Sequence, residues 1–413
     1  MDELDRQLTD PSFFATGDPH ASLRRLRVED PVHWTQGALS RGFWSVTRYA
    51  DVMAVAIDPR TFSSERGGVT LPSSPQMEQI SPQAMGCGES MIMTDPARHI
   101  AMRKAFNRLF LPRAVAVHEA SGRKLVAEIL DEVLPRGECD LVVDVAVKLP
   151  MAFICEMMGI PRKDWVRMNT WGNMVAGAED PEYQVGSALD TRREGNSSIF
   201  KYCAQLSLER RGGAGDDLLS IIGNAEVQGR ELNWRELGHN GGLFVLGGLE
   251  TTRNAISGGV LALIENPREV DRLRSAPSLM HPACEEILRW TSPITQLMRI
   301  ATRHVELRGK KIREGDRVVM WHASANRDED AFADPDRFDV SRSPNEHLAF
   351  GRGEHFCIGA HLARLELRLM LEAVLREMPD LRLAGDVERL RSNVVAGIKH
   401  MPVRFSPRRA AAA

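Results

Sequence analysis

The chain has 413 residues, of which 43% are hydrophobic and 26% charged, and its formal net charge at pH 7 is −3. This length allows a large core in one big domain or two ordinary ones, and the slight negative charge argues against a general nucleic-acid binder. The N-terminus, Met-Asp-Glu-Leu-Asp-Arg, lacks the apolar part of a signal peptide, and no apolar run approaches the ~20 residues that span a bilayer. We therefore expect a cytoplasmic protein without a membrane anchor.

The cysteines contain no Cys-x-x-Cys pair, which disfavours a zinc site or a dithiol redox centre. They are Cys87, Cys139, Cys155, Cys203, Cys284 and Cys357. In a cytoplasmic protein we expect all but the last to be reduced and mostly buried, as small hydrophobic side chains.

The first part of the chain predicts a helix over 19–29, strands at Val32–Thr35 and Phe43–Val46, and a helix over Ala50–Ile57. Residues 63–93 then change character, with many Gly, Ser, Pro and Met and no hydrophobic period. A loop of this length in a compact enzyme is usually a lid or a binding loop. Disorder is the alternative, but disordered segments are normally more charged.

Thr94-Asp95-Pro96 predicts the start of a helix, with a capping side chain followed by proline in the first turn. His99 and Arg103 lie four residues apart on one face of this helix. Residues 96–118 contain no acid and several basic residues, which alone would indicate a solvated face. The basic residues are Arg98, Arg103, Lys104, Arg108 and Arg113.

Further helices are predicted at 114–134, 140–158, 162–177, 186–211 and 215–223. The third has an apolar side that includes Trp171 and Met174, and such a side is most often part of a core.

The longest helical stretch, 233–264, contains a contradiction. It carries glycines that each cost about 1 kcal/mol relative to alanine inside a helix. These are Gly241, Gly242, Gly247, Gly248, Gly258 and Gly259. Such a helix either packs very closely on a neighbour or is locally opened.

Glu286 and Arg289 are one helical turn apart and able to pair, although this spacing is common on solvated helices. Pro293 ends that helix. An extended piece, Thr295–Ile300, presents Arg299. Strands are then predicted at Val305–Leu307, Lys311–Ile312, Val318–His322 and Met401–Phe405, with a glycine-containing turn over Asn393–Lys399.

The stretch Phe350–Gly359 places one cysteine, Cys357, in a glycine-rich loop directly before a helical pattern. Glycine lets the backbone approach a bulky group, and a helix N-terminus favours a thiolate. A thiolate in such a loop suits a soft or redox metal, and haem iron is a candidate. A buried cysteine in a glycine turn is the other reading of this loop.

With its spacing, the set Phe350, Gly351, Gly353, His355, Cys357 and Gly359 resembles the haem-binding loop of the cytochrome P-450 family. Gly247–Thr252, Glu286–Arg289 and Ala325–Asp328 also resemble family motifs, in the family's order, so the resemblance covers about residues 10–406. It implies one mainly α-helical (α+β) P-450 domain over 1–413, with small β-sheets. About ten N-terminal and seven C-terminal residues are expected to fray.

The resemblance also implies roles for individual residues. Cys357 would be the iron ligand, Glu250 and Thr251 would manage protons in a helix that widens at Gly247, and Glu286, Arg289 and Arg337 would form a structural group. The expected haem contacts are His99, Arg103, Gly247, Arg299, Phe350, His355, Cys357 and Gly359. The basic run 98–113 would lie on the proximal side, beside the thiolate.

The function implied is that of a monooxygenase that inserts one atom of O2 into a C–H bond or alkene. It would use haem b, with electrons from NAD(P)H passed through a reductase and a ferredoxin-type donor, and we expect a monomer. Residues 177–186 would be the flexible turn of a lid. Residues expected to line an apolar substrate pocket are Ile92, Met93, Met174, Leu243, Val245, Leu246, Ile294 and Val395.

The substrate stays open between two classes. One is an intermediate of a natural-product pathway (a polyketide, macrolactam or terpenoid), and the other is a sterol or fatty-acyl compound. A non-catalytic haem-thiolate sensor and a peroxide-driven peroxygenase are the alternative functions, although either would leave the Glu250–Thr251 pair unexplained.

Overall fold

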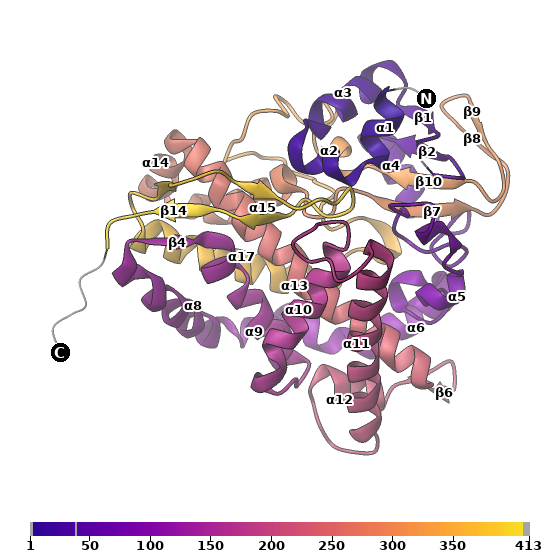
Figure 1. Ribbon diagram of the computed structural model, residues 1–413, viewed down its shortest axis with the longest axis horizontal. Coiled ribbons are helices and arrows are strands. Elements are labelled where there is room, and N and C mark those ends of the chain that lie inside the picture. Colours follow the sequence, from indigo (N-terminus) through magenta and orange to yellow (C-terminus); the bar gives the residue numbers. More distant parts are fainter. Residues whose placement is uncertain (1–2, 38, 408–413) are drawn as a thin grey trace.

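The computed structural model describes residues 3–37 and 39–407, and it is mainly helical with small β-sheets, as the sequence predicted (Figure 1). The helices are α1 (Glu3–Thr9), α2 (Pro11–Thr16), α3 (Pro19–Glu29), α4 (Tyr49–Ile57), α5 (Pro82–Met85), α6 (Pro96–Phe106), α7 (Pro112–Ala116), α8 (Glu119–Val133), α9 (Lys148–Met157), α10 (Trp165–Ala176), α11 (Ala188–Glu209), α12 (Leu218–Gly223), α13 (Trp234–Glu265), α14 (Pro267–Ser275), α15 (Met280–Thr291), α16 (His322–Ala325) and α17 (Ala360–Glu377).

The largest sheet has the strand order β1-β2-β10-β7-β3 and lies at the upper right of Figure 1, beside the N-terminal helices. Its strands are β1 (Val32–Thr35), β2 (Phe43–Val46), β10 (Arg317–Met320), β7 (Leu297–Ala301) and β3 (Phe62–Ser63). Among the described strands, β2 and β10 alone pair in parallel, which joins the N-terminal part of the chain to residues 317–320. The strand predicted over Val318–His322 ends at Met320, because His322 already begins α16.

The remaining strands form small sheets and hairpins. They are β11 (Arg382–Leu383), β14 (Pro402–Arg404) and β4 (Glu138–Asp140) in one sheet, and the pairs β12 (Glu388–Arg389) with β13 (Ile398–His400), β5 (Glu226–Val227) with β6 (Arg230–Glu231), and β8 (Val305–Leu307) with β9 (Lys310–Ile312).

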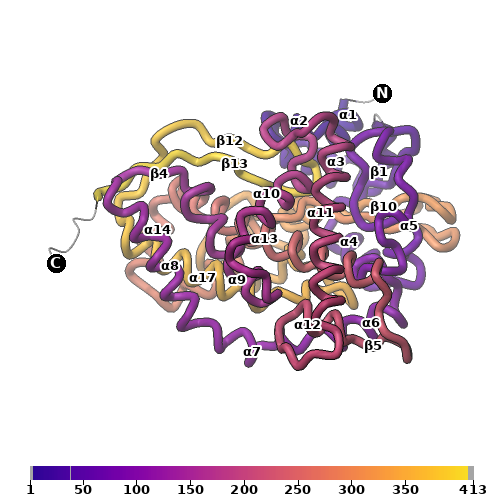
Figure 2. Tube along the Cα trace, turned by 60° about the horizontal axis from the view of Figure 1, so that its bottom comes forward, coloured from indigo at the N-terminus to yellow at the C-terminus, as the bar shows by residue number. Residues whose placement is uncertain are grey.

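Helix α13 is the centre of the fold, and Figure 2 shows it among α9, α10 and α11. It begins with a capping box formed by Asn233 and Glu236. Its glycines mostly serve close packing. A Cβ on Gly241 would lie 2.4 Å from Cys203 Cβ, and one on Gly259 would lie 2.6 Å from Ile287 Cγ2. Gly247 differs, because no atom lies within 4 Å of its Cβ position.

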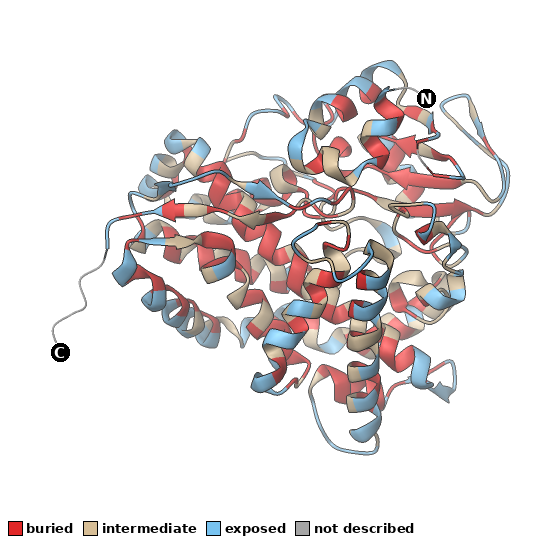
Figure 3. Ribbon diagram, viewed as in Figure 1, coloured by how far each residue is buried: buried red, intermediate tan, exposed pale blue. Residues whose placement is uncertain are grey.

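Close packing therefore explains most of these glycines, and the alternative of a locally opened helix is wrong, although Gly247 has open space beside it. The widening expected at Gly247 does not interrupt the helix, which is α-helical without a break from Trp234 to Glu265. Buried side chains concentrate along α13 and on the faces that neighbouring helices turn toward it, while the outer faces of α8 and α14 are exposed (Figure 3).

Several predicted elements differ in the structure. The first ten residues do not fray over the described part, since α1 begins at Glu3, and the tail from 408 lies outside the described residues. The loop 63–93 contains η1 (Met77–Gln79), α5 and η2 (Met91–Met93). The helix predicted over 140–158 is divided into a π-helical turn, η5 (Val142–Ala146), and α9.

Asp95 precedes α6 but does not cap it with its side chain. Its carboxylate instead accepts hydrogen bonds from Ser63 Oγ at 2.6 Å and from the Ser64 N–H at 2.9 Å. Asp95 thus fastens the start of α6 to the end of β3. Within residues 3–37 and 39–407, every helix falls short of the length or apolarity needed to cross a membrane.

Candidate active site

The cysteine loop is shaped by two glycines with positive φ. Gly351 has φ +68° and Gly353 has φ +72°, a region that side chains with a Cβ rarely adopt. A Cβ on Gly353 would also lie 2.9 Å from the carbonyl oxygen of Ala56 on α4. The Cys357 N–H donates to the Phe350 carbonyl at 2.9 Å, which closes the loop just before α17.

Cys357 is half-buried by accessible area. Burial raises the pKa of Cys357, while the Gly359 N–H and the charges of Arg103 and Arg364 act in the opposite direction. Arg364 lies over the Phe350 ring at 4.6 Å, so α17 and the loop hold each other.

Next to the loop is a group of cationic and hydrogen-bond-donating side chains without a matching acid. Arg299 is buried, and burial lowers its pKa to about 10 against the charge of Asp95. Its guanidinium donates to the Met298 carbonyl at 2.8 Å. Burial lowers the pKa of His355 to about 2, helped by the charges of Arg299, His99 and Arg103, and its Nδ1 is buried without a hydrogen-bond partner.

His99 is tied differently from the other donors. Its Nδ1 lies 2.9 Å from the Met91 carbonyl oxygen and its Nε2 lies 2.9 Å from the Glu354 carbonyl oxygen. The His99 and His355 rings are in contact, with centroids 4.0 Å apart and planes tilted by 47°. His99 therefore braces the cysteine loop against η2, and a contact between His99 and haem stays a prediction.

These residues fit a haem. Buried cations are normally paired, and Arg299 is buried with no ion pair among the described residues. Arg299 and Arg103 both lie close enough to His355 for their charges to lower its pKa, so two carboxylates placed among these side chains would be paired. A cysteine in a glycine loop with these donors beside it would suit the iron and the propionates of that cofactor.

On α13, Thr251 and Gly247 face open space. The Thr251 Oγ1 donates to the Gly247 carbonyl at 2.7 Å, the backward bond available to threonine in a helix. Glu250 is buried and forms an ion pair with Arg253, one turn later. Arg253 also donates to Asn173 Oδ1 on α10 at 2.7 Å, so the pair is fastened to a neighbouring helix.

Comparisons with known proteins agree with this geometry. A family model described as cytochrome P-450 matches residues 278–379. A methyl-branched lipid omega-hydroxylase of Mycobacterium tuberculosis is 38% identical over 415 aligned residues, which cover 97% of this chain and 95% of the relative. The chain belongs to the cytochrome P-450 family.

Two further similarities extend over nearly the whole P-450. Linalool 8-monooxygenase of Pseudomonas putida is 34% identical over 97% of this chain and 99% of its own length. A Mycobacterium marinum cytochrome P-450 solved in complex with pseudoionone has a TM-score of 0.87 and 36% identity, covering 96% of this chain and 97% of that one. Its relatives are named hydroxylases and monooxygenases, so this P-450 is an oxidoreductase enzyme.

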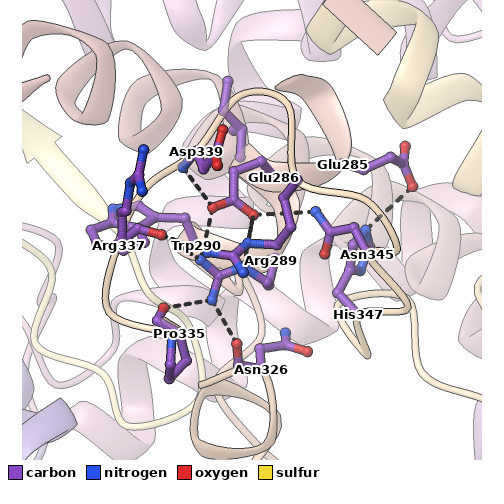
Figure 4. A network of polar contacts seen from close by, with 12 residues as sticks. Glu285, Glu286, Arg289, Trp290, Asn326, Pro335, Arg337, Asp339, Asn345 and His347 are labelled. Carbon is purple, nitrogen blue, oxygen red and sulfur yellow. Dashed lines mark hydrogen bonds and ion pairs between the residues drawn. The ribbon is translucent and has the colours of Figure 1, made fainter. Parts of the chain in front are cut away.

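The Glu286–Arg289 pair lies in the interior of the P-450 and is fully buried (Figure 4). Arg289 Nε donates to Glu286 at 2.7 Å and Nη2 at 2.8 Å. Arg337, the predicted third member, does lie in this network, but its side chain is exposed. Only the Arg337 carbonyl takes part, at 3.3 Å from Arg289, and the second cation on Glu286 is Arg342, whose Nε donates at 3.0 Å.

The predicted pocket residues lie on elements that contact one another. Ile92 and Met93 are on η2, which is linked to α13 by the Met91 N–H, a donor to Asn240 Oδ1 at 2.8 Å. Met174 is on α10, and Leu243 and Leu246 are half-buried on α13. Ile294 pairs with Val395 in an isolated β-bridge. The prediction that Val245 lines the pocket is wrong, because this residue is fully buried in the core, on the side of α13 opposite to Leu243 and Leu246.

The basic run of α6 and α7 lies beside the cysteine loop of the P-450, since α6 packs against η8 (Gly353–His355). A hollow of about 510 Å³ lies between them, lined by His99, Ile100, Arg103, Lys104, Asn107, Gly353 and Glu354. Lys104, Arg108 and Arg113 are exposed. Arg98 is not free for a partner, because it is ion-paired with Glu236.

Some site residues carry no local signal in the sequence. His322 is buried near Arg299, and burial together with that charge lowers its pKa to about 4. Ser64 Oγ lies 3.3 Å from His355 Nε2. Arg253 could have been found, because its spacing of three residues from Glu250 predicts a pair on one helix face.

Proposed function

We propose that this P-450 uses O2 to hydroxylate or epoxidise a largely apolar small molecule. Two features together carry the proposal. One is the glycine-rich loop that holds Cys357, and the other is the face of α13 at Gly247 and Thr251, which opens into free space. A haem held there by a cysteine thiolate supplies the chemistry, because thiolate ligation favours O–O cleavage. The protein positions the substrate, controls protons and excludes water.

Each site residue then has a defined task. Cys357 ligates the iron, while Phe350 and Gly359 shape the loop around it. Arg103 and Arg299 would neutralise the propionates, which stay costly in the interior unless paired. The neutral His355 would donate a hydrogen bond to one of them, with His99 packed beside it. Gly247 leaves room beside the substrate.

Thr251 and Glu250 move protons in this proposal. The Thr251 hydroxyl is held by the Gly247 carbonyl at 2.7 Å and can orient a water in the open space next to it. Glu250 supplies protons to that water once its bond to Arg253 loosens.

The apolar pocket residues favour a lipid or a terpenoid as the substrate. The relatives support both, since one is named a methyl-branched lipid omega-hydroxylase and another linalool 8-monooxygenase. Electrons are proposed to come from NAD(P)H through a reductase and a ferredoxin-type donor.

The proposal is tested by turnover with isotopically labelled O2. Haem-loaded protein, a ferredoxin system and a panel of a branched fatty acid, linalool and a sterol are incubated together, and products are identified by mass spectrometry. We expect one labelled oxygen atom in a hydroxylated or epoxidised product. Product formed only with added hydrogen peroxide, and never with O2 and reductant, would contradict the proposal and favour a peroxygenase.

A further inference from the structure

Arg192 lies on the face of α11 that is turned toward the interior. Gly195 and Ile199 follow it at helical spacing on the same face. A Cβ on Gly195 would lie 2.9 Å from the Trp171 carbonyl oxygen of α10, and Ile199 Cγ2 lies 3.5 Å from the Cβ position of Gly242 on α13. Figures 1 and 2 show α11 lying alongside these two helices.

Arg192 is half-buried by accessible area, but its Nε is inaccessible and has no hydrogen bond. Among the described residues its guanidinium forms no ion pair, and Glu179 is the carboxylate whose charge acts on it. Burial lowers the pKa of Arg192, and the charge that opposes this effect is that of Glu179. Buried arginines are seldom left unpaired, because the uncompensated charge is costly. The next residue, Arg193, is exposed.

The surroundings of Arg192 belong to the two segments predicted to cover the substrate pocket. Glu179 follows α10, and its carboxylate accepts a hydrogen bond from Ser73 Oγ, which belongs to the loop 63–93. The two covering segments therefore meet at Glu179, whose negative charge raises the pKa of Arg192. Met174 Cβ, on the pocket side of α10, lies 3.0 Å from the Cβ position of Gly195, one helical turn from Arg192.

We propose that Arg192 selects the substrate by binding a carboxylate at the end of an apolar molecule that is remote from the oxidised carbon. This inference rests on the proposed monooxygenase function and names the substrate class for it, an apolar chain or ring system with a terminal carboxylate. The guanidinium offers planar, bidentate recognition of that group. Apolar side chains of the pocket hold the rest of the molecule, so charge at one end fixes which end approaches the haem.

The test compares two probes of equal length, dodecanoic acid and 1-dodecanol, by calorimetric binding to the haem-loaded protein at neutral pH. We expect the acid to bind at least about tenfold more tightly than the alcohol, since hydrogen bonds to charged groups contribute about 1.5–3 kcal/mol. Arg192→Met should abolish this preference and change the affinity for the alcohol by no more than about twofold. Arg193→Met is the matched control, and it should keep the preference.

Arg192→Lys keeps the charge without the planar fork and should retain part of the preference, which separates a charge effect from misfolding of the methionine variant. Glu179→Gln should tighten binding of the acid, because it removes a nearby negative charge.

An equal loss of affinity for acid and alcohol in Arg192→Met would overturn the proposal and make Arg192 a brace between the covering segments. Absence of any preference in the parent protein, or failure of all acids from octanoic to hexadecanoic to bind, would overturn it too. Binding is measured without turnover, so an acid held by Arg192 that yields no oxygenated product would count against the proposed function instead.

Discussion

Thr251 and Glu250 are adjacent in sequence but lie in different surroundings. The Thr251 hydroxyl is accessible and bonded to the Gly247 carbonyl, whereas the Glu250 carboxylate is buried against Arg253. The hydroxyl is thus in position to hold water in the open space, and the carboxylate is held behind it. Substitutions of Thr251 and of Glu250 should therefore affect the reaction differently.

Thr251→Ala should keep haem and substrate binding but divert most reducing equivalents into hydrogen peroxide, because the variant lacks the hydroxyl that would hold the proton-delivering water. Glu250→Gln should slow product formation by about 100-fold, the low end of what general acid–base catalysis contributes. Product and peroxide are measured per NAD(P)H consumed. The control is Thr252→Ala, which removes a buried hydroxyl next to the site. Undiminished coupling in Thr251→Ala would remove the role proposed for this residue.

Residues within contiguous motifs could be located from the sequence, whereas their partners often could not. Cys357 and Glu250 are marked by runs of neighbouring residues of special type, such as glycines beside a thiol. Arg342 was missed because it bonds Glu286 from a loop 56 residues away, and nothing in its own neighbourhood distinguishes it from Arg337. Long-range polar contacts depend on the path of irregular segments, which propensity does not determine.

The segment between α10 and α11 is fastened by a cluster of charges. Lys399 Nζ lies 3.1 Å from Asp180 and 2.9 Å from Glu182. His400 lies between two carboxylates, with Nδ1 2.6 Å from Asp140 and Nε2 3.0 Å from Glu182. These bonds join the proposed lid to β13.

This fastening should weaken as the pH rises. Burial alone would lower the pKa of His400, but the hydrogen bonds that its ring donates to Asp140 and Glu182 outweigh burial and raise the pKa. A raised pKa means that the contribution of the protonated ring to stability is complete below its ordinary value of 6.5 and is lost as the pH passes the raised value. Hydrogen exchange of residues 177–187, corrected for its intrinsic pH dependence, should therefore increase over that range. In His400→Gln the corrected exchange should be fast at every pH, and unchanged protection in this variant would contradict the prediction.

The network around Glu286 leads to a separate prediction, which compares the contributions of Arg342 and Arg337 to the free energy of unfolding. Arg342→Met should lower the free energy of unfolding by about 2 kcal/mol, because it leaves part of a buried carboxylate unpaired. Arg337→Met should change it by no more than about 0.5 kcal/mol, since its side chain is exposed and only its carbonyl takes part. Urea denaturation of both variants measures the difference. Equal destabilisation would mean that the Arg337 side chain does contribute to the network.

Across the whole molecule, helix periodicity predicted most of the fold, and the irregular parts were the least accurate. Helices such as α3 and α13 have the expected bounds to within about one residue. The loop 63–93 was predicted only as irregular, because its short helices lack a period long enough to detect. The pairing of β2 with β10, which joins distant parts of the chain, had no signal in either strand.

The basic face beside the cysteine loop should bind an acidic electron donor. Arg108→Glu and Arg113→Glu should slow reduction by the ferredoxin, more at low than at high salt, because opposite charges mainly raise the rate of association. Arg268→Glu is the control, an exposed arginine on α14 at the far end of the molecule from α6 (Figure 1). Stopped-flow reduction at several ionic strengths measures the effect. Equal rates for all variants at every ionic strength would exclude this face as the docking site.

The central claim is that Cys357 ligates the haem iron, and the spectrum of the reduced, CO-bound protein tests it most directly. A thiolate ligand shifts the Soret band of that complex to the red. We expect the purified protein to show the shifted band, Cys357→Ala to lose it, and Cys155→Ala, a change at another cysteine without a role in the site, to keep it. A shifted band that persists in Cys357→Ala would contradict the account.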